Sequence, residues 1–326
     1  MEQILSVDDV LAALKEKGCC CGVVNPDVYH AMKPMLEEAL GVPVLSKSSL
    51  CDFMQSPYRY HWQQEHGGKE KTASMALGSL VDCLVLTPGL FEDQYMCEEK
   101  KVAVKKDGTP YANGMQDPEQ KARWQAAAAD GVTVISCEQL QRGQDIAKCA
   151  VAHLEHNGLR WGESFASQVG MWVYLKELDG EELVCPVVLT GMIDILPTDG
   201  AHGDELWDLK TTSVDVCNAT MLEYTMRDYH YGIQAAMYLD LYNLATEEVR
   251  SAFTFLFVGT VGEPVLSRKV CMSAEVVDLY RAQYRKEVRN YCLAWKMNDW
   301  GTAQLDTHMY MPSKGEWLAY GKEVGV

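Results

Sequence analysis

Apolar and polar residues along the chain follow two periods, one typical of helices and one typical of strands. Apolar residues that recur three and four positions apart indicate amphipathic helices. This spacing predicts helices over residues 7–17, 26–39, 46–65 with a break at Pro57, 75–88, 118–129, 138–156, 219–244 and 274–297. Alternating or short apolar runs between turn residues predict strands over residues 132–136, 167–178, 182–196, 206–212, 251–260 and 265–272. Strands framed by helices on both sides of the sequence indicate an α/β (α+β) domain, with a mixed sheet between helical layers.

Neither an internal repeat nor a long linker rich in Pro, Gly and Ser divides the chain. We therefore predict an N-terminal helical extension over residues 1–45, followed by one elaborated domain over residues 46–326. The Asp-Gly pair at residues 179–180 predicts a tight turn between two strands. The cysteine triplet at residues 19–21 cannot easily aim all its thiols at one metal ion, so we interpret it as part of a loop between the first two helices.

The composition is that of a globular protein. The 326 residues include 48% hydrophobic and 23% charged residues, which excludes wholesale disorder. Lys and Arg number 29 against 46 Asp and Glu, a net charge of -17. Such a charge argues against a protein that coats nucleic acid over its whole surface, because phosphate contacts come from Lys and Arg. A local basic groove is still compatible with it.

Cysteine spacing and the N-terminus bear on cofactors and location. The 12 cysteines include no C-x-x-C pair, so neither a zinc ribbon nor a ferredoxin-like cluster is expected. The first 18 residues have the pattern of an acidic amphipathic helix and not that of a secretion signal. No apolar stretch approaches the roughly 20 residues of a membrane span. We therefore expect a cytoplasmic protein with reduced thiols and no membrane partner.

Three charged residues lie in otherwise apolar predicted strands. Asp194 is near the end of one strand, and Asp208 and Lys210 are two positions apart on the next, hence on one face. A hairpin-like connection over residues 197–205 would place Asp194 beside them. Two carboxylates and an ammonium are costly to bury unless a cation and an anion join them. Mg²⁺ and a phosphodiester would satisfy that condition, with the lysine polarising the attacking water and offsetting negative charge.

A D-x-K triplet alone is weak evidence, because most such triplets are exposed edge residues that form a solvated ion pair. The apolar residues around each acid favour a functional role, since charges embedded in apolar strands are more often functional. On the next predicted helix, Tyr231, Gln234 and Tyr238 share one face, and the two tyrosines are candidate DNA contacts. Gln234 is either a group that orients water or phosphate or an amide on the helix surface.

Basic residues form two local groups. Arg281, Arg285 and Arg289 recur every four residues on the last predicted helix, where nearby acids favour a solvated face. Four lysines in a predicted loop are better candidates for DNA contact, because few acids oppose them. They are Lys100, Lys101, Lys105 and Lys106.

Five motifs occur in an order that carries a family resemblance. They are S-x-S-x-L with a following Pro-Tyr (residues 46–58), L-G-S-x-x-x-C-x-V-L-x-P (77–88), G-x-x-D (191–194), D-x-K-T-T (208–212) and Y-x-x-Q-x-x-x-Y (231–238). Each motif alone is unspecific, whereas their order is specific. Over roughly residues 44–320 the chain resembles the RecE-type exodeoxyribonucleases (exodeoxyribonuclease VIII-like), a branch of the PD-(D/E)XK nuclease superfamily found in phages and prophages.

The resemblance implies a restriction-endonuclease-like core and Mg²⁺-dependent degradation of linear double-stranded DNA from its ends, with Mn²⁺ as an alternative metal, for recombination of the phage type. It also implies a ring-shaped homo-oligomer that works beside a single-strand annealing protein of the RecT type. In the implied site, Asp194, Asp208 and the carbonyl of Leu209 bind the metal. Lys210 is the catalytic cation, and Gln234 is a further catalytic residue, which orients the nucleophilic water or a phosphate.

Three positions bear on how far the resemblance extends. Asp82 stands where the family usually has histidine, and we predict it as a further metal ligand because a carboxylate binds Mg²⁺. Ile193 stands before the first acid, where proline is common. Ser56 stands where iron–sulfur relatives carry cysteine, so no cluster is expected. The alternatives are a defence or repair nuclease of the same superfamily and a catalytically inactive DNA-end-binding module.

Overall fold

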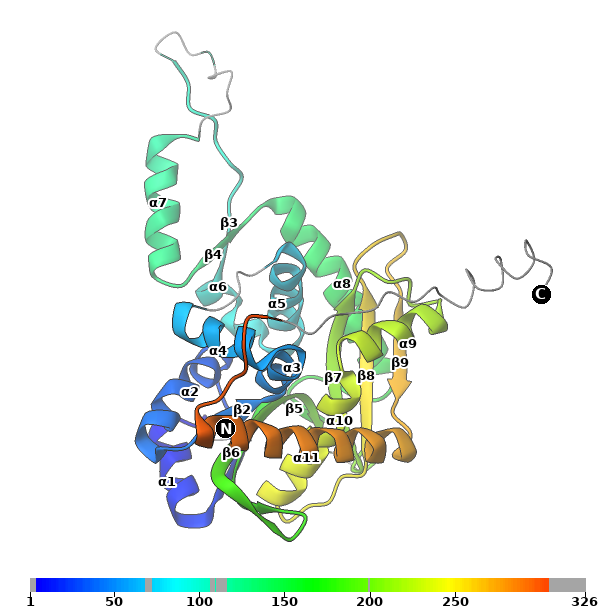
Figure 1. The fold of residues 1–326 in the computed structure, drawn as a ribbon. Helices are drawn as coiled ribbons and strands as arrows, with labels where there is room; N and C mark the ends of the chain where they lie inside the picture. Colours follow the sequence, from blue (N-terminus) through cyan, green and yellow to red (C-terminus); the bar gives the residue numbers. More distant parts are fainter. Residues whose placement is uncertain (1–3, 68–71, 106–108, 110–115, 199, 305–326) are drawn as a thin grey trace, which may run out of the picture.

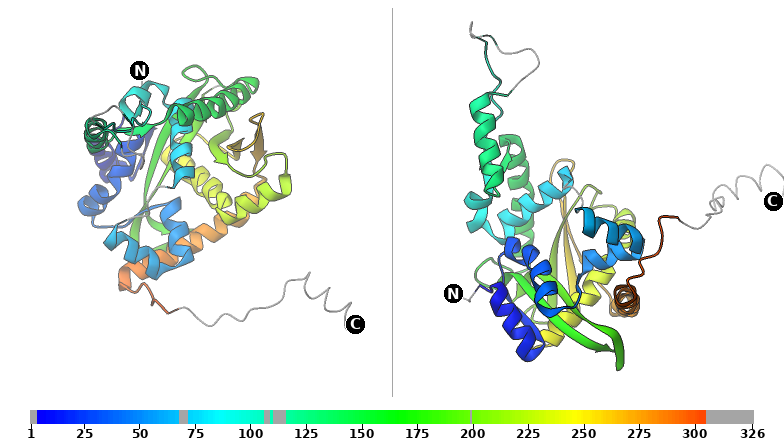
Figure 2. Two further views of the ribbon diagram at one scale, coloured as in Figure 1. Left: turned by 90° about the horizontal axis from the view of Figure 1, so that it is seen from above. Right: turned by 60° about the vertical axis from the view of Figure 1, so that its left-hand side comes forward.

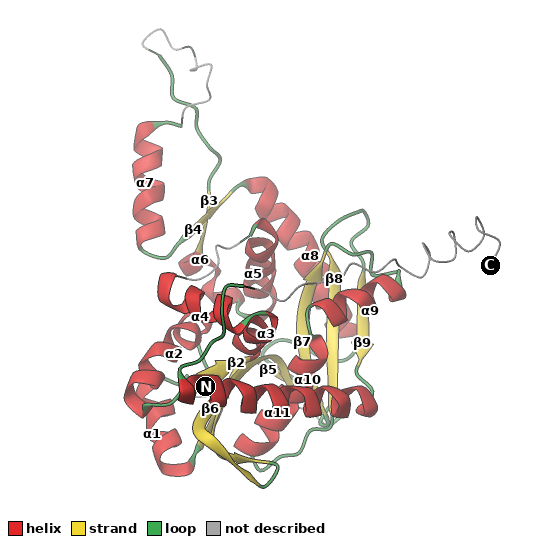
Figure 3. Ribbon diagram, viewed as in Figure 1, coloured by secondary structure: helices red, strands yellow, loops and turns green. Residues whose placement is uncertain are grey.

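A mixed sheet flanked by helices forms the body of the molecule (Figure 1). A computed structural model describes residues 4–67, 72–105, 109, 116–198 and 200–304. The strands of the main sheet are β1 (Cys19–Val23), β2 (Val44–Ser46), β5 (Phe165–Leu178), β6 (Glu181–Pro197), β7 (Glu205–Thr212), β8 (Ala252–Gly259) and β9 (Ser267–Cys271). The helices are α1 (Val7–Lys17), α2 (Pro26–Leu40), α3 (Lys47–Gln55), α4 (Pro57–His66), α5 (Ala73–Leu86), α6 (Phe91–Gln94), α7 (Pro118–Ala129), α8 (Cys137–His156), α9 (Ala219–Asp228), α10 (Tyr231–Ala245) and α11 (Ala274–Met297). The predicted mixed sheet between helical layers is confirmed (Figure 3).

The main sheet has the strand order β1-β5-β6-β7-β8-β9, with β2 paired to β6. The pairs β7–β8 and β2–β6 are parallel, and the other neighbouring pairs are antiparallel. β5 and β6 form a long hairpin whose turn residues, Asp179 and Gly180, both have positive φ. This is the conformation that a type I′ turn requires, and Asp-Gly is a preferred sequence for it. The predicted turn is therefore confirmed.

Side chains that alternate along β7 and β8 bury both faces of the sheet. Phe255 and Phe257 of β8 pack in one core with α10 and α11. Leu256 between them packs in the other core, with α5 and α8, and Figure 2 shows helices on both sides of the strands. Trp207 of β7 belongs to the α5 and α8 core. Because a strand alternates, its neighbour Asp208 faces the α10 side.

The N-terminal helices cover a third core at the β1 end of the sheet, where Leu36 of α2 is buried with Trp172 of β5. The cysteine triplet is not the loop that we predicted. It belongs to β1, which pairs antiparallel with residues 169–173 of β5. The prediction was wrong because three identical side chains show no alternation of apolar and polar positions, and a tertiary contact with β5 decides the structure.

The single helix predicted over residues 219–244 is two helices, α9 and α10. His230 between them has a φ of 53°, a left-handed conformation that interrupts the helix. The sequence Tyr-His-Tyr at residues 229–231 contains neither Gly nor Pro, the usual signs of a break. In contrast, the break predicted at Pro57 is confirmed, since α3 ends at Gln55 and α4 begins at Pro57.

A smaller unit projects from the body. It consists of α7 and a two-stranded parallel sheet, β3 (Tyr95–Cys97) and β4 (Thr133–Ile135), as Figure 1 shows. Among the described residues, no single helix is long and apolar enough to cross a membrane. Only α5 taken together with residues 88–94 reaches the required length and composition, and the two parts are bent by 114°.

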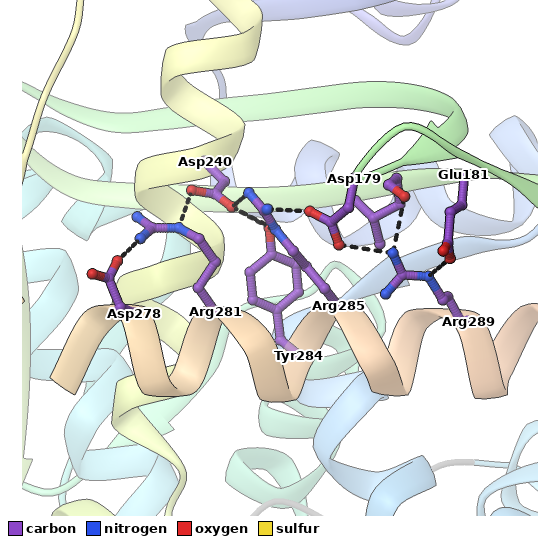
Figure 4. A network of polar contacts seen from close by, with 9 residues as sticks. Asp179, Glu181, Asp240, Asp278, Arg281, Tyr284, Arg285 and Arg289 are labelled. Carbon is purple, nitrogen blue, oxygen red and sulfur yellow. Dashed lines mark hydrogen bonds and ion pairs between the residues drawn. The ribbon is translucent and has the colours of Figure 1, made fainter. Parts of the chain in front are cut away.

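The arginines of α11 form ion pairs with acids on neighbouring elements (Figure 4). Arg281 Nε lies 2.8 Å from Asp240 Oδ1 on α10. Arg285 binds both Asp240 and Asp179, the first residue of the hairpin turn. Arg289 Nη2 lies 2.7 Å from Asp179 Oδ2. These arginines therefore fix α11 to α10 and to the β5–β6 hairpin, in place of the solvated face that we predicted.

Candidate active site

Asp194 and Asp208 lie side by side where β6 meets β7. Ile195 of β6 is paired with Trp207 of β7. Asp194 Oδ2 accepts a hydrogen bond of 3.0 Å from the backbone N–H of Leu209. Both acids line one cavity of about 440 Å³. The expectation that the connection between the two strands brings these carboxylates together is confirmed.

The two oxygens of Asp208 have different partners. The residue is only 2% exposed. Its Oδ2 forms an ion pair with Nζ of Lys210, which lies on the same face of β7 as the strand alternation predicts. Its Oδ1 accepts a hydrogen bond from Nε2 of Gln234 on α10. Gln234 is itself buried, so it is not an amide on the helix surface.

Asp82 reaches the same region from α5. This helix packs closely on β7: a Cβ at Gly78 would lie 3.2 Å from Thr211 Oγ1, so a glycine permits the approach. Asp82 and Asp194 line a smaller cavity of about 220 Å³. That cavity shares His30, Met192 and Asp194 with the larger one. The structure thus brings Asp82 beside the acids with which the family resemblance associates it.

Burial and repulsion between the acids govern the electrostatics of the site. Burial raises the pKa of Asp82 to about 7, while Lys210 opposes the rise and Asp208 adds to it. Burial and the nearby Asp208 raise the pKa of Asp194 well above its ordinary range. Burial alone would lower the pKa of Lys210, but Asp208 and Asp194 outweigh burial and raise it. The ammonium of Lys210 therefore stays charged at neutral pH. An added cation would favour the ionised form of Asp82 and Asp194.

Lys47, at the first position of α3, is a site residue that sequence reasoning missed. Its Nζ donates a hydrogen bond of 2.7 Å to the carbonyl of Tyr229 and lies 5.3 Å from the ring centre of Tyr231. Nζ of Lys210 lies 5.6 Å from the same ring. Burial lowers the pKa of Lys47, and the charge of Lys210 lowers it further. The S-x-S-x-L motif contained this lysine, but at a position that the motif leaves open.

Helix α2 also contributes to the 440 Å³ cavity through residues that the sequence did not single out. Tyr29 and Lys33 line it from this helix, and the hydroxyl of Tyr29 lies 3.1 Å from Thr190 Oγ1 of β6. The cavity wall further includes Ser46, Ser48, Trp172 and Met192. The segment predicted as a helical extension therefore forms part of the site.

The two candidate tyrosines of α10 line the 440 Å³ cavity together with Gln234. Tyr231 stacks on Phe255 of the sheet, with ring centres 5.3 Å apart. Tyr238 packs against Gly191 of the G-x-x-D motif, where a Cβ would lie 2.7 Å from its ring. Glycine at this position lets the tyrosine approach β6 closely.

The predicted lysine group lies apart from this cavity. Lys100, Lys101 and Lys105 are exposed, follow β3 along the chain and do not line the 440 Å³ cavity. Lys106 lies outside the described residues. The structure therefore does not bring Lys100, Lys101 or Lys105 together with Asp208 and Lys210.

The donor atoms of the site suit a hard divalent cation. Asp194 and Asp208 present carboxylate oxygens, the ligands that Mg²⁺ prefers. Asp208 Oδ2 is buried and, apart from its ion pair with Lys210, has no hydrogen-bond partner in the described chain. Such an oxygen has capacity for a further partner. Among all the residues that the structure describes, no group of three His, Cys, Asp or Glu side chains is arranged to hold one metal ion. Metal binding by Asp194, Asp208, Asp82 and the Leu209 carbonyl therefore stays a prediction.

The chain belongs to the PD-(D/E)XK nuclease superfamily, whose family model matches residues 44–305. The mixed sheet with flanking helices agrees with the restriction-endonuclease-like fold of this superfamily, as we predicted. Its members typically use divalent metal ions. The protein is therefore a nuclease by family.

A solved structure similar to this chain is that of a "Putative exonuclease" from Eubacterium rectale. The similarity covers 91% of this chain and 98% of that one, with a TM-score of 0.52 and 14% sequence identity. At this identity the likeness shows the fold alone. The structures of SSO0001 and of Rai1 from Scheffersomyces stipitis cover 56% and 78% of this chain, at 11% identity each and TM-scores of 0.25 and 0.27. No curated protein matches the chain.

Proposed function

We propose that this protein is a metal-dependent exonuclease that degrades linear double-stranded DNA from its ends. The observation that carries the proposal is the ion pair between buried Asp208 and partly exposed Lys210 beside Asp194, on the wall of a cavity in a PD-(D/E)XK chain. A buried ion pair alone is weak evidence of function. A pair that lines a cavity together with a second acid of raised pKa is stronger evidence. The order of the five motifs supports exonuclease action of the RecE type.

The cofactor in this proposal is Mg²⁺, with Asp194 and Asp208 as ligands and with Asp82 and the Leu209 carbonyl completing the set. Mn²⁺ is an alternative, because the same oxygen donors accept it. The bound metal supplies Lewis acidity and a water of lowered pKa. The raised pKa of Asp194 supports this assignment, since a cation between the carboxylates relieves the repulsion that helps to raise it.

Five residues of the chain have further roles in the proposal. Lys210 stays charged and offsets the negative charge that develops on the reacting phosphate. Gln234 holds Oδ1 of Asp208 and so fixes the orientation of that carboxylate. Lys47 binds a phosphate oxygen of the substrate, because its ammonium lines the same cavity. Tyr231 and Tyr238 contact the DNA from α10.

The proposal extends to the assembly and setting of the enzyme. A monomer of net charge -17 has no surplus of cations with which to hold DNA through many turnovers. We therefore propose a closed homo-oligomeric ring that surrounds the duplex. The motif resemblance adds a cytoplasmic role in phage-type recombination, beside an annealing protein of the RecT type. A single molar mass equal to that of the monomer, measured by light scattering at assay concentration, would contradict the ring.

A comparison of linear and covalently closed circular duplex DNA tests the activity. With Mg²⁺ we expect the linear form to disappear and the circle to survive, and EDTA should protect both. Asp208→Ala is the inactive control. Equal loss of circles would indicate an endonuclease. Binding to DNA ends without any cleavage would indicate the catalytically inactive module.

A further inference from the structure

A second cavity, half of whose lining residues carry aromatic rings, adjoins the candidate active site. Its volume is about 320 Å³, at the lower end of the roughly 300–1,000 Å³ typical of small-molecule sites. We term it the aromatic cavity. Its rings are those of Tyr60 and His61 of α4, Tyr291 and Trp295 of α11, and Trp300.

Two rings of the aromatic cavity are partly exposed, that of His61, whose side chain is 34% exposed, and that of Trp295. Trp300 is 8% exposed and stacks on His61, with ring centres 4.7 Å apart. Tyr60 and Tyr291 are buried, and their hydroxyls lie 3.2 Å apart. Trp295 packs on Tyr291 at 6.4 Å but is 38% exposed. The buried rings thus hold Trp295 in place, while part of its own surface can accept another ring.

The charged groups of the aromatic cavity are paired with one another. Lys33 Nζ lies 3.9 Å from Glu37 Oε1 and 3.2 Å from the hydroxyl of Tyr60. His61 Nε2 lies 3.4 Å from Glu65 Oε1, an ion pair when the histidine is protonated. Among the described residues, the cavity therefore offers no unpaired cation to a phosphate. Its rings suit a neutral aromatic group instead.

Lys33 also lines the 440 Å³ cavity of the candidate active site, so the two cavities share a wall. Helix α2 forms that wall. Tyr29 and Lys33, one turn apart, line the active-site cavity, and Lys33 and Glu37, one further turn along, line the aromatic cavity. Two amides, those of Gln64 and Asn298, also line the aromatic cavity. Amides are groups that hydrogen-bond to base edges.

We propose that the aromatic cavity binds an unpaired nucleobase of the DNA strand next to the cleaved phosphate, stacked on Trp295. The proposal rests on the proposed function, because the strand reaches this cavity from the active site along α2. Stacking on an aromatic ring accepts every base, since every base has a π-face. It also gives an acidic protein a hold on the strand that does not depend on cations.

The experiment measures the binding affinity of the protein for two labelled duplexes that have equal numbers of phosphates. Ca²⁺ replaces Mg²⁺ in the measurement. One carries a short oligothymidine overhang, and the other carries an abasic overhang of the same length. The variants are Trp295→Ala, Trp295→Phe and the control Trp62→Ala. Trp62 is 48% exposed on α4 and stacks on His66, but it does not line the aromatic cavity.

Wild type and Trp62→Ala are expected to bind the thymidine overhang about tenfold more tightly than the abasic one, as for one stacked base. Trp295→Ala should reduce this ratio to near one, and Trp295→Phe should keep most of it. Trp295→Leu retains apolar bulk without a ring and replaces Trp295→Ala if that variant does not fold. An unchanged ratio in the Ala or Leu variant, or a wild-type ratio near one, would overturn the proposal.

Cleavage of linear duplex DNA with Mg²⁺, measured on the same preparations, separates this proposal from the proposed function. A wild-type protein that prefers the thymidine overhang but does not cleave contradicts the exonuclease alone. A protein that cleaves without any preference for bases contradicts the role of the aromatic cavity alone.

Discussion

Replacing Asp82 with asparagine removes one carboxylate from the site at nearly constant volume. Burial raises the pKa of Asp82 from its ordinary 3.8 to about 7. This difference of about three pH units corresponds to roughly 4 kcal/mol of preference for the protonated carboxyl in the folded chain. The unfolded chain has no such preference, so the ionised carboxylate opposes folding when no metal is bound.

The sign of the pH dependence follows from the raised pKa. The folded chain binds this proton more tightly than the unfolded chain, so the stabilisation is complete below pH 3.8 and is lost as the pH rises through about 7. Between pH 5 and pH 8, Asp82 should lower the free energy of unfolding by roughly 2–3 kcal/mol in the absence of metal. Asp82→Asn lacks this contribution, so it should be less sensitive to pH and more stable than wild type at pH 8.

Urea unfolding at pH 5 and pH 8 measures the effect, first with EDTA and then with Mg²⁺. Asp93→Asn, a change at an exposed acid, is the matched control. With Mg²⁺ at pH 8, wild type should gain more stability than Asp82→Asn if Asp82 is a ligand. Parallel pH profiles of wild type and Asp82→Asn in EDTA would refute the burial argument. Equal stabilisation of both by Mg²⁺ would refute the ligand assignment.

Four other outcomes test the remaining parts of the site and fold. Lys210→Ala should lose cleavage by orders of magnitude but keep DNA-end binding in Ca²⁺; a near wild-type rate in single-turnover kinetics would refute the D-x-K assignment. Gln234→Leu should lower kcat by roughly ten- to a hundredfold, since it frees the Asp208 carboxylate, and an unchanged kcat excludes a positioning role. Asp240→Asn should lower the free energy of unfolding in urea by roughly 1–3 kcal/mol, because it breaks the arginine ion pairs. The affinity for DNA ends should stay unchanged, and a loss of that affinity would assign those arginines to DNA binding. The affinity for duplex ends should fall with salt at a log–log slope of about −2, from Lys47 and Lys210, whereas a slope of about −5 would implicate the lysine group after β3.

Features decided by neighbouring residues could be predicted from the sequence. The turn at residues 179–180 follows from an Asp-Gly pair, and the break between α3 and α4 follows from Pro57. The alternation of β7 was sufficient to place Asp208 and Lys210 on one face. In each case the relevant contact is local, so the pattern contains the information.

Features decided by distant contacts could not be predicted in the same way. β1 is a strand because it pairs with β5, and its own composition does not require it. Lys47 reaches the site through a carbonyl that lies 182 positions away in the sequence. The arginines of α11 looked like a solvated face, because their partners Asp240 and Asp179 lie on other elements. The motif order pointed to Asp82 as part of the site, because the family usually has a histidine at that position.

The positions of the charged residues matter more for DNA binding than the net charge of the protein. The arginines of α11 are paired with acids and so are not available to phosphates. Lys47 and Lys210 instead line the cavity that holds Asp194 and Asp208. An acidic surface disfavours contact with the body of a duplex, while this cavity offers cations, oxygen ligands for a metal and, in the adjoining aromatic cavity, a ring for an unpaired base. Under the proposed function, we infer a preference for DNA ends from this arrangement, because a cavity of about 440 Å³ has room for an unpaired strand end rather than for a continuous duplex.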